Sequence, residues 1–270
     1  MRSSATVLAD SISVDGQRLT TLQVRMPRIV LAEFNTHRKL SRNSASSRAI
    51  PVSKQIAMVQ DDPFVPAKFP LNQPGMSAAQ YLEAGDPAFD LEVKQWLADR
   101  DHAVEATRGR AERGIHKQIA NRILEPFMWH EAIVSATDWS NFIALRAHPE
   151  AQPEIQEPAE AMRDAIAAST PTPRAEGEWH LPLTGFDGDA DLAPADLIKV
   201  SVGRCARVSY LTHLGARDPQ ADITLFERLQ ASRHLSPFEH AAQAMPGAWA
   251  NFDGWRQARW FLEQGEPLPS

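Results

Sequence analysis

The sequence predicts a mixed α/β (α+β) protein whose 270 residues form a single domain. Stretches with the two-residue period of strands and stretches with the 3.6-residue period of helices follow one another along the chain. No internal repeat and no coiled-coil pattern interrupts this succession. A chain of this length can bury one sizeable core or two small ones. Its composition, 43% hydrophobic and 23% charged, is ordinary for a globular protein.

The first elements expected are two strands within residues 5–26, separated by a turn at Asp15-Gly16. Apolar and polar residues alternate along the second strand, as they do when one face of a strand is buried. Pro27 suits the first turn of a helix, in which Ile29 and Phe34 share one apolar face. This helix is expected to lead into the polar segment described below.

The middle of the chain is expected to be mainly helical. Residues 60–86 contain several prolines and glycines and are expected to form an ordered covering loop. The apolar stripe within residues 93–104 predicts a long amphipathic helix, which Gly114 ends. Residues 115–124 are suited to a second, shorter helix.

The second half begins with an expected strand over residues 128–136, followed by a helix that Thr137 or Asp138 caps. Residues 168–196 are rich in proline, glycine, alanine and aspartate and are predicted to be a connecting segment within the single domain. After it we expect a strand near residues 199–210 and a helix that begins at Asp218-Pro219.

The bulk properties argue against several classes of protein. No apolar run approaches the roughly 18–20 residues that span a membrane, so we expect no membrane partner and a cytoplasmic location. Cys205 is the only cysteine, which excludes an internal disulfide and a cysteine-rich metal site. The net charge of −6 argues against a general nucleic-acid binder. A local basic cluster can still hold one small anion.

No metal site is expected. His130-Glu131 lacks the second histidine of a metalloprotease helix, because position 134 is valine. The alternating aspartates of residues 187–191 resemble a calcium loop but are followed by leucine where that loop needs glycine. The chain also has no dinucleotide-binding glycine fingerprint and no phosphate-binding P-loop.

The most informative stretch is residues 36–48, Thr-His-Arg-Lys-Leu-Ser-Arg-Asn-Ser-Ala-Ser-Ser-Arg. It is dense in cations and in small hydroxyl and amide side chains, and Leu40 is its only large apolar residue. We therefore expect that it does not bury a core face. Its donors suit phosphate oxygens and the edge of a pyrimidine ring.

This stretch resembles the signature of the flavin-dependent thymidylate synthases, Arg-His-Arg-x-x-Ser-x-Asn-Glu-x-Ser-x-Arg-Tyr. The chain departs from it at three positions: Thr36 replaces the first arginine, Ser44 the glutamate and Ala49 the tyrosine. The positions that match are His37, Arg38, Ser41, Asn43, Ser46 and Arg48.

Four further segments resemble the same family. Residues 114–124 are similar to its Gly-x-x-x-Glu-x-Ala-Arg-x-x-Leu-Pro element, and residues 141–155 to its Asn-Phe-x-x-Leu-Arg and Ala-Gln-x-Glu-Ile elements. Residues 205–210 and 234–240 resemble its Ala-Arg-Val-Ser and His-x-Thr/Ser-Pro-Phe-Glu-His segments, which usually precede the first motif. The resemblance therefore implies a circularly permuted member, in which residues 18–26 lie near the segment after His240.

The resemblance implies an enzyme that reductively methylates dUMP to dTMP. FAD would be the cofactor, with NADPH and methylenetetrahydrofolate as co-substrates, so the partners would be a small nucleotide and a folate. No protein nucleophile is needed, and Cys205 is expected to be a small core residue. Members of the family are homotetramers with sites shared between subunits, so a homotetramer is implied here.

The resemblance also assigns roles to individual residues. Arg146 would contact the pyrimidine and favour its ionised form, because a guanidinium stabilises developing negative charge. Ser46 would share the catalytic role and, with Arg48, hold the nucleotide. The residues implied to contact the substrate are Glu33, Ser46, Arg48, Asn121, Arg122 and Arg146. Those implied to contact the flavin are Thr36, His37, Arg38, Asn43, Asn141, Ser209, His234, Ser236 and Glu239.

Several departures fall within the implied site and leave two alternatives open. Glu33 replaces a glutamine, which exchanges an amide that can donate for a carboxylate that only accepts. The other departures remove cations or amides, namely Thr36, Asn121 (with Arg122 beside it), Ser135 and Thr137. The alternatives are a flavin-dependent one-carbon modification of another pyrimidine nucleotide and a non-catalytic nucleotide-binding relative.

Overall fold

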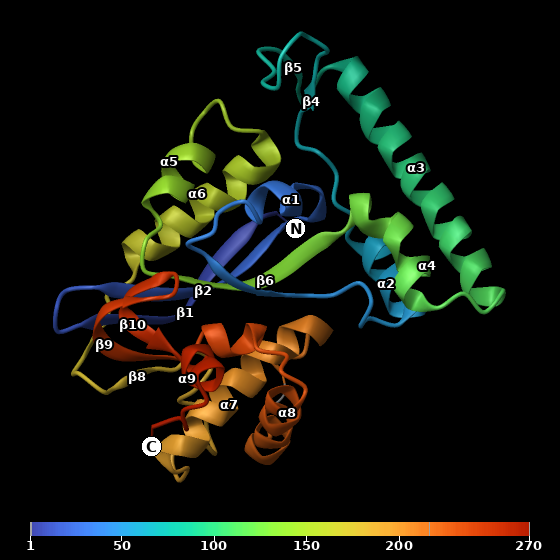
Figure 1. The fold of residues 1–270 in the computed structure, drawn as a ribbon. Helices are drawn as coiled ribbons and strands as arrows, with labels where there is room; N and C mark the ends of the chain where they lie inside the picture. Colours follow the sequence, from blue (N-terminus) through green and yellow to red (C-terminus); the bar gives the residue numbers. More distant parts are fainter. Residues whose placement is uncertain (1, 216, 270) are drawn as a thin grey trace.

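The computed structural model describes residues 2–215 and 217–269. Its centre is a five-stranded sheet with the strand order β3-β6-β2-β1-β7 (Figure 1). These strands are β1 (Ser4–Ser13), β2 (Arg18–Pro27), β3 (Ser41–Ser44), β6 (Trp129–Ala136) and β7 (Thr172–Arg174).

The predicted strands of the N-terminal part are confirmed. β1 and β2 form an antiparallel hairpin whose turn places Gly16 at φ 81°, a left-handed conformation that glycine adopts without strain. The predicted strand at 128–136 is β6, which pairs antiparallel with β2 along its whole length and with the short strand β3 on its other side. In β2, the alternation of apolar and polar residues marked the fully buried side chains of Leu22, Val24 and Met26 correctly.

Different helices pack on the two faces of the sheet. On one face, Ala132 and Val134 of β6 pack with residues of α5 (Ser140–Arg146) and α6 (Pro153–Ala168). On the other face, Ile133 packs with Cys205 at the end of α7 (Pro194–Ala206). Cys205 is fully buried, which confirms the expected core role, and burial raises the pKa of its thiol.

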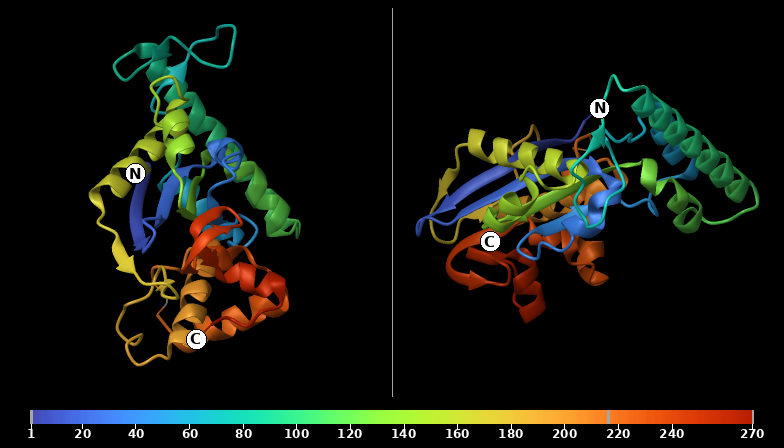
Figure 2. Two further views of the ribbon diagram at one scale, coloured as in Figure 1. Left: turned by 60° about the vertical axis from the view of Figure 1, so that its left-hand side comes forward. Right: turned by 90° about the horizontal axis from the view of Figure 1, so that it is seen from above.

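A helical arm extends to one side of the sheet (Figures 1 and 2). Its long helix α3 confirms the predicted amphipathic helix, and Gly114 follows its end at φ 78°. Val104 of α3 packs against Val59 and Leu124 in a separate apolar cluster. The arm consists of α2 (Val52–Asp61), the ribbon strands β4 (Phe69–Pro70) and β5 (Tyr81–Leu82), α3 (Pro87–Glu112), α4 (Lys117–Ala120) and the 3-10 helix η2 (Asn121–Phe127).

The C-terminal part lies on the α7 side of the central sheet (Figure 1). Asp218 accepts hydrogen bonds from the first turn of α8, so the predicted start of this helix is confirmed. A second sheet with the order β10-β9-β8 follows. The elements are η3 (Arg207–Tyr210), α8 (Pro219–Ala231), η4 (Ser236–Glu239), β8 (Trp179–His180), β9 (Ala242–Trp249), β10 (Phe252–Gln257) and α9 (Ala258–Gln264).

Three expectations about local structure are wrong. The strand expected near residues 199–210 is helical, comprising the end of α7 and η3, because residues 200–206 are buried on every side and show no readable period. Pro27 ends β2 instead of starting a helix. The helical segment after it is only η1 (Arg28–Val30) and α1 (Leu31–Phe34), and Ile29 is exposed.

The expected meeting of residues 18–26 with the segment after His240 is confirmed. Leu19 of β2 packs in one buried cluster with Ala242 and Trp255. The Trp255 indole N–H also donates to the Gln17 carbonyl at 2.9 Å. In the usual family order, the segment that resembles residues 234–240 comes before the one that resembles the first motif. A circular permutation therefore requires that the two segments still meet in space, as they do here.

The segment at 168–196 holds β7, β8 and the first residues of α7 in addition to connecting loops. β7 pairs parallel to β1 at the edge of the central sheet. Within the described ranges, no helix is long and apolar enough to cross a membrane. The same residues contain no group of three or more side chains placed to hold a metal ion.

Candidate functional site

Several polar side chains of the stretch at 36–48 are buried, contrary to expectation. Ser41, Asn43 and Ser47 are each less than 9% exposed. β3 brings Ser41 and Asn43 into the central sheet beside β6, where polar groups are tolerated only when they are hydrogen-bonded. The Asn43 amide, for example, donates to the Cys205 carbonyl at 2.8 Å. Pairing with distant backbone, which the sequence does not reveal, explains the difference.

Residues from the C-terminal third complete this region. The Ser46 amide N–H donates to the Ser209 carbonyl at 3.3 Å, and the Ser209 hydroxyl donates to the Ser44 carbonyl at 3.4 Å. The Ser236 hydroxyl donates to the Arg42 carbonyl at 3.1 Å. Two sequence blocks more than 160 residues apart are therefore held together around one surface.

A cavity of about 510 Å³ opens at this surface. Among the residues implied by the resemblance, Asn43, Ser46, Arg48, Ser209 and His234 line it. The remaining lining residues are Ser44, Ala45, Ala49, Gln118, Ala206, Tyr210, Leu225, Arg228, Leu229 and Pro237.

Sequence reasoning missed Gln118 and Arg228 as lining residues. Arg228 lies on the exposed face of α8, where a single arginine follows no pattern that sets it apart from a solvated surface residue. The resemblance includes Gln118 in a matching block but gives it no role. Only the packing of α8 and α4 near β3 shows that both face the cavity.

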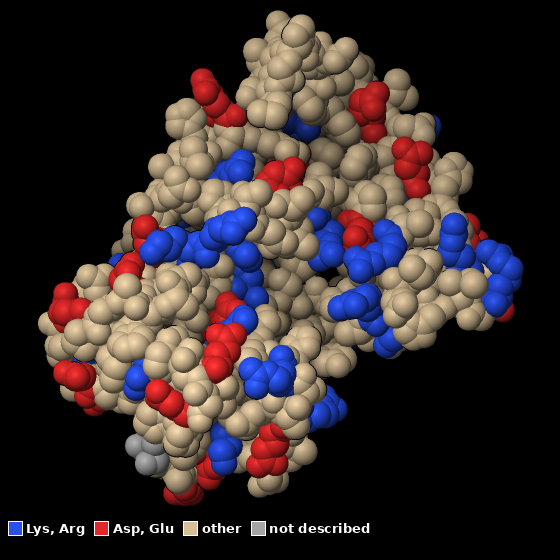
Figure 3. All heavy atoms as spheres, viewed as in Figure 1, with Lys and Arg blue, Asp and Glu red and all other residues tan. Residues whose placement is uncertain are grey.

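The cavity is positively charged although the protein carries a net charge of −6. Arg48 and Arg228 line it, and no aspartate or glutamate is among its lining residues. Neither guanidinium has a hydrogen-bond or ion-pair partner among the residues described. Figure 3 shows Lys and Arg side chains gathered around a hollow in the middle of one face. Guanidinium groups without such partners, placed beside hydroxyl groups, are suited to binding a phosphate or another oxyanion.

Three implied residues form a second group. Arg146 Nε donates to His37 Nε2 at 2.9 Å, and the His37 ring meets Phe142 edge-on at 5.0 Å. The pKa of His37 is lowered, mainly by burial and also by the charges of Arg146 and Arg42. An interaction with Asn141 opposes this change without reversing it. His37 is thus held neutral as an acceptor for Arg146. Arg146 is not among the residues that line the cavity.

Asn121 supports the loop that carries Ser46 and Arg48. It is fully buried, and its amide donates to the Ser47 carbonyl at 2.7 Å and to the Ile50 carbonyl at 3.0 Å. The neighbouring Arg122 is instead exposed and pairs with Glu125 at 2.7 Å.

Replacing Asn121 by alanine is expected to lower the free energy of unfolding by about 1–3 kcal/mol, because two buried carbonyls lose their donor. Chemical denaturation of the purified variant measures this change. Gln95→Ala is the matched control, since Gln95 is an exposed amide that donates to Asp99 on the surface of α3, and it is expected to change stability by less than about 0.5 kcal/mol. Equal stabilities of the two variants would contradict the supporting role.

The other implied residues lie outside the cavity lining. The Thr36 hydroxyl donates to the Glu33 carbonyl at 2.7 Å, and Arg38 is exposed. Glu239 forms an ion pair with Arg259. Glu33 Oε2 is buried and has no hydrogen-bond partner among the described residues.

Two further departures noted in the sequence lie in polar surroundings. The Ser135 hydroxyl is buried and shares hydrogen bonds with the Thr21 hydroxyl at 2.6 Å and with His240 Nδ1 at 2.9 Å. The Thr137 hydroxyl accepts from the Asp253 amide at 3.1 Å. Both side chains are therefore engaged with other parts of the same chain.

Residues 17–172 match the family model described as thymidylate synthase complementing protein. Among solved structures, the chain is similar to a UMP/dUMP methylase, PolB from Streptomyces cacaoi. For the form bound with 5-Br dUMP, the identity is 18% and the TM-score 0.49, covering 61% of this chain and 90% of that one. For the form bound with 5-Br UMP, the identity is 19% and the TM-score 0.49, covering 61% and 89%. No curated protein matches the sequence.

Proposed function

The chain belongs to the thymidylate synthase complementing protein family, the flavin-dependent thymidylate synthases, and we propose that it methylates dUMP at C5 to give dTMP. The observation that carries this proposal is the cationic cavity lined by Ser46, Arg48 and Arg228. A nucleotide phosphate would be held there by the two guanidinium groups and the serine hydroxyl.

Arg146 would stabilise the negative charge that develops on the pyrimidine ring. His37 supports this role, because its neutral ring accepts from Arg146 Nε and fixes the direction of the guanidinium. The other guanidinium nitrogens remain available to a carbonyl oxygen and a ring nitrogen. Because Arg146 lies outside the cavity of its own chain, the complete site would combine the cavity of one subunit with Arg146 of another. A homotetramer with shared sites meets this need.

The proposed cofactor is FAD, with NADPH and methylenetetrahydrofolate as co-substrates. The donor set fits such a cofactor in part. Arg38 and His234 are exposed, and they offer a guanidinium charge and ring nitrogens to a phosphate-bearing group. His37 is buried, and Asn141, which interacts with it, is exposed and can donate from its amide. When bound, the flavin would relay the one-carbon unit and supply hydride. We also propose that the whole chain acts as one domain and that it works in the cytoplasm.

The test is the release of tritium from 5-tritiated dUMP in the presence of FAD, NADPH and methylenetetrahydrofolate. Release is expected from the wild type and is expected to be lost in Arg146→Ala. Arg48→Ala and Arg228→Ala are expected to weaken dUMP binding by about 10- to 100-fold, because each removes a charge-assisted hydrogen bond to phosphate. Arg163→Ala is the control, since Arg163 pairs with Asp164 on the surface.

A second candidate is the same one-carbon chemistry on another pyrimidine nucleotide. The unpartnered carboxylate oxygen of Glu33 favours it, because a carboxylate accepts hydrogen bonds from an exocyclic amine such as that of cytosine. A flavin-loaded protein that releases no tritium from dUMP would overturn the dUMP assignment and direct the assay to other nucleotides. A protein that binds nucleotide but never flavin would point to a non-catalytic relative.

A further inference from the structure

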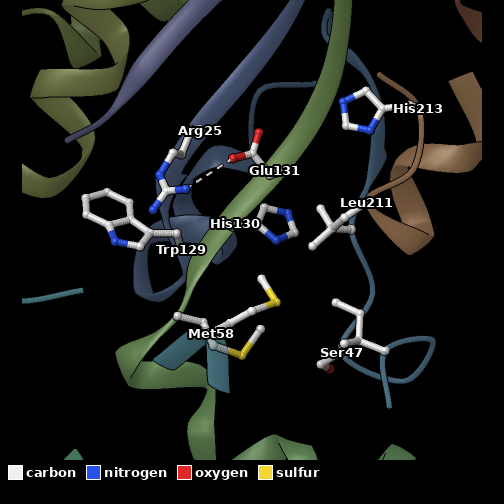
Figure 4. Close-up of a pocket in the computed structure, with 11 residues that line it drawn as sticks. Arg25, Ser47, Met58, Trp129, His130, Glu131, Leu211 and His213 are labelled. Carbon is white, nitrogen blue, oxygen red and sulfur yellow. Dashed lines mark ion pairs between the residues drawn. The ribbon is translucent and has the colours of Figure 1, made fainter. Parts of the chain in front are cut away.

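A second cavity of about 240 Å³ lies behind the loop that carries Ser46 and Arg48. Ala45 lines both cavities, whereas Ser47 faces only this one. The walls come from β2, α2 and β6 on one side and from Leu211 and His213 on the other (Figure 4). Apart from Ala45, none of the residues that line this cavity also lines the cationic cavity.

Residues that line the cavity carry buried polar atoms that have no hydrogen-bond partner among the described residues. They are Arg25 Nε, Trp129 Nε1, His130 Nε2 and both ring nitrogens of His213. His130 is 1% exposed and His213 is 3% exposed. Unpaired buried polar groups are rare in folded proteins, because each costs free energy relative to its hydrated state. Their gathering in one cavity indicates a ligand that pairs with them.

The protonation of His130 follows from its partner. An Arg28 guanidinium N–H lies 3.0 Å from His130 Nδ1, and because arginine only donates, this nitrogen must accept. Burial, reinforced by the Arg28 charge, lowers the pKa of His130 to about 3, so the ring is neutral at pH 7. Its proton therefore sits on Nε2. That nitrogen is a donor without a partner among the described residues.

The lining as a whole selects an uncharged acceptor. Trp129 and Arg25 add two unpaired N–H donors to that of His130, so donors outnumber acceptors. The charge of Arg25 is already paired with Asp62 at 2.5 Å and with Glu131 at 3.7 Å, so the lining has no uncompensated positive charge to attract an anion. Carbonyl oxygens and ring nitrogens of a neutral molecule satisfy such donors without bringing a charge.

The walls and the volume favour a small aromatic ring. Met58, Met128 and Trp129 are among the lining residues, and thioether sulfurs make favourable contacts with aromatic rings. A cavity of roughly 150 Å³ is enough for benzene. The volume here suits a ring of nucleobase size. We propose that this cavity binds an uncharged heteroaromatic ring of nucleobase size, at a site separate from the cationic cavity.

Isothermal titration of the full-length protein with uracil and with hypoxanthine tests the proposal, and benzene serves as the ring without acceptors. Saturable binding with one site per chain is expected for at least one base, and weaker binding for benzene. His213→Phe, which removes two ring nitrogens and fills space, is expected to weaken the affinity at least about 10-fold. His102→Phe, at an exposed position of α3, is expected to bind as the wild type does.

Trp129→Phe is the second variant, because it keeps an aromatic wall and removes only the indole N–H donor and part of the ring. It is expected to weaken binding in the same direction as His213→Phe. The proposal is overturned if no base binds, which would mean that water alone occupies the cavity. It is also overturned if both variants bind as the wild type does, or if benzene binds as tightly as the bases.

Competition with dUMP separates this proposal from the methylation. The base is expected to remain bound when dUMP saturates the protein, because the two ligands occupy different cavities. Competitive displacement by dUMP would assign the cavity to the nucleotide site and overturn the proposal of a separate site. Failure of the protein to bind dUMP would affect only the proposed methylation, since base binding is measured without it.

Discussion

Lowering the pH from 7.5 to 5 is expected to reduce the free energy of unfolding by roughly 6 kcal/mol, because three histidines are buried in neutral form. Burial lowers the pKa values of His130, His180 and His240 to about 3. In the unfolded chain a histidine titrates near 6.5. Above that pH the three rings are neutral in both states, and they contribute no pH dependence.

Between pH 6.5 and about 3, the unfolded chain binds protons that the folded protein cannot take up. Stability is therefore highest above pH 6.5 and falls as the pH is lowered, by about 2 kcal/mol for each histidine at pH 5. A total of that size is comparable with the whole stability of an ordinary domain. Acid unfolding is thus expected at a pH at which most carboxylates are still ionised.

Two of the buried histidines belong to one chain of hydrogen bonds. His180 shares one hydrogen bond with the Thr21 hydroxyl at 2.8 Å and another with the Ser11 hydroxyl at 2.9 Å. Thr21 continues through Ser135 to His240 Nδ1. This chain joins the central sheet to the C-terminal part, and the partners of the two rings in it are neutral hydroxyl groups, so a charge placed on either ring would be buried without a charged hydrogen-bond partner.

Urea unfolding at pH 7.5, 6.0 and 5.0 measures the effect. His180→Gln is expected to lower stability at every pH but to reduce the pH slope by about one third, because one of three titrating groups is gone. His102→Gln, at an exposed position, is expected to leave the slope unchanged. Equal stabilities at pH 7.5 and pH 5.0 would show that the histidines are accessible to protons in the folded state.

Replacing Arg204 by methionine is expected to lower the free energy of unfolding by about 3–5 kcal/mol. The Arg204 side chain is fully buried and donates to both carboxylate oxygens of Asp189, at 2.7 and 2.8 Å. It also donates to Asp222 at 3.0 Å and to the Leu183 carbonyl at 2.8 Å. Its removal leaves buried carboxylates without their counter-charge.

The close packing of α7 and α8 leaves little space for Arg204 and its two aspartate partners to rearrange. A Cβ added at Gly203 would lie next to the Asp222 carbonyl oxygen, so the two helices are already in backbone contact there. Burial alone would raise the pKa of Asp189, but the hydrogen bonds and charge of Arg204 lower it. The aspartate is therefore expected to be ionised in the folded protein and to depend on the arginine.

Thermal or urea unfolding of Arg204→Met against Arg163→Met measures this contribution. Arg163 forms a surface ion pair with Asp164, and its loss is expected to change stability by less than about 1 kcal/mol. A loss below about 1 kcal/mol in Arg204→Met would mean that the carboxylates find other partners. Because α7 leads into Ala206 and Ser209 in the cavity wall, the same variant is expected to bind nucleotide more weakly.

Clear local signals account for most of the elements predicted correctly. Leu22, Val24 and Met26 of β2 alternate with polar residues, and α8 begins at a capping aspartate. β6 was also predicted, although it is buried on both faces of the sheet. The end of α7 was predicted wrongly, because a helix enclosed on every side carries no amphipathic period.

The motif resemblance located Ser46, Arg48, Ser209 and His234, and the structure brings these four to one cavity. It did not reveal Arg228, whose position on α8 matters only through tertiary packing. Nor did it reveal that Asn43, Ser236 and Asn121 donate to backbone carbonyls of other segments. A sequence motif names the residue types at a site but not the partners that each one has.

The sequence by itself determined the family, the main strands and helices and the polar stretch that carries Ser46 and Arg48. Only the tertiary structure decided which polar side chains remain free to meet a ligand and which are paired inside the protein. The physical reason is that a buried polar group must be hydrogen-bonded, and its partner is usually distant in the sequence. Arg48 and Arg228 remain unpaired among the described residues, whereas Asn121 and Ser135 do not.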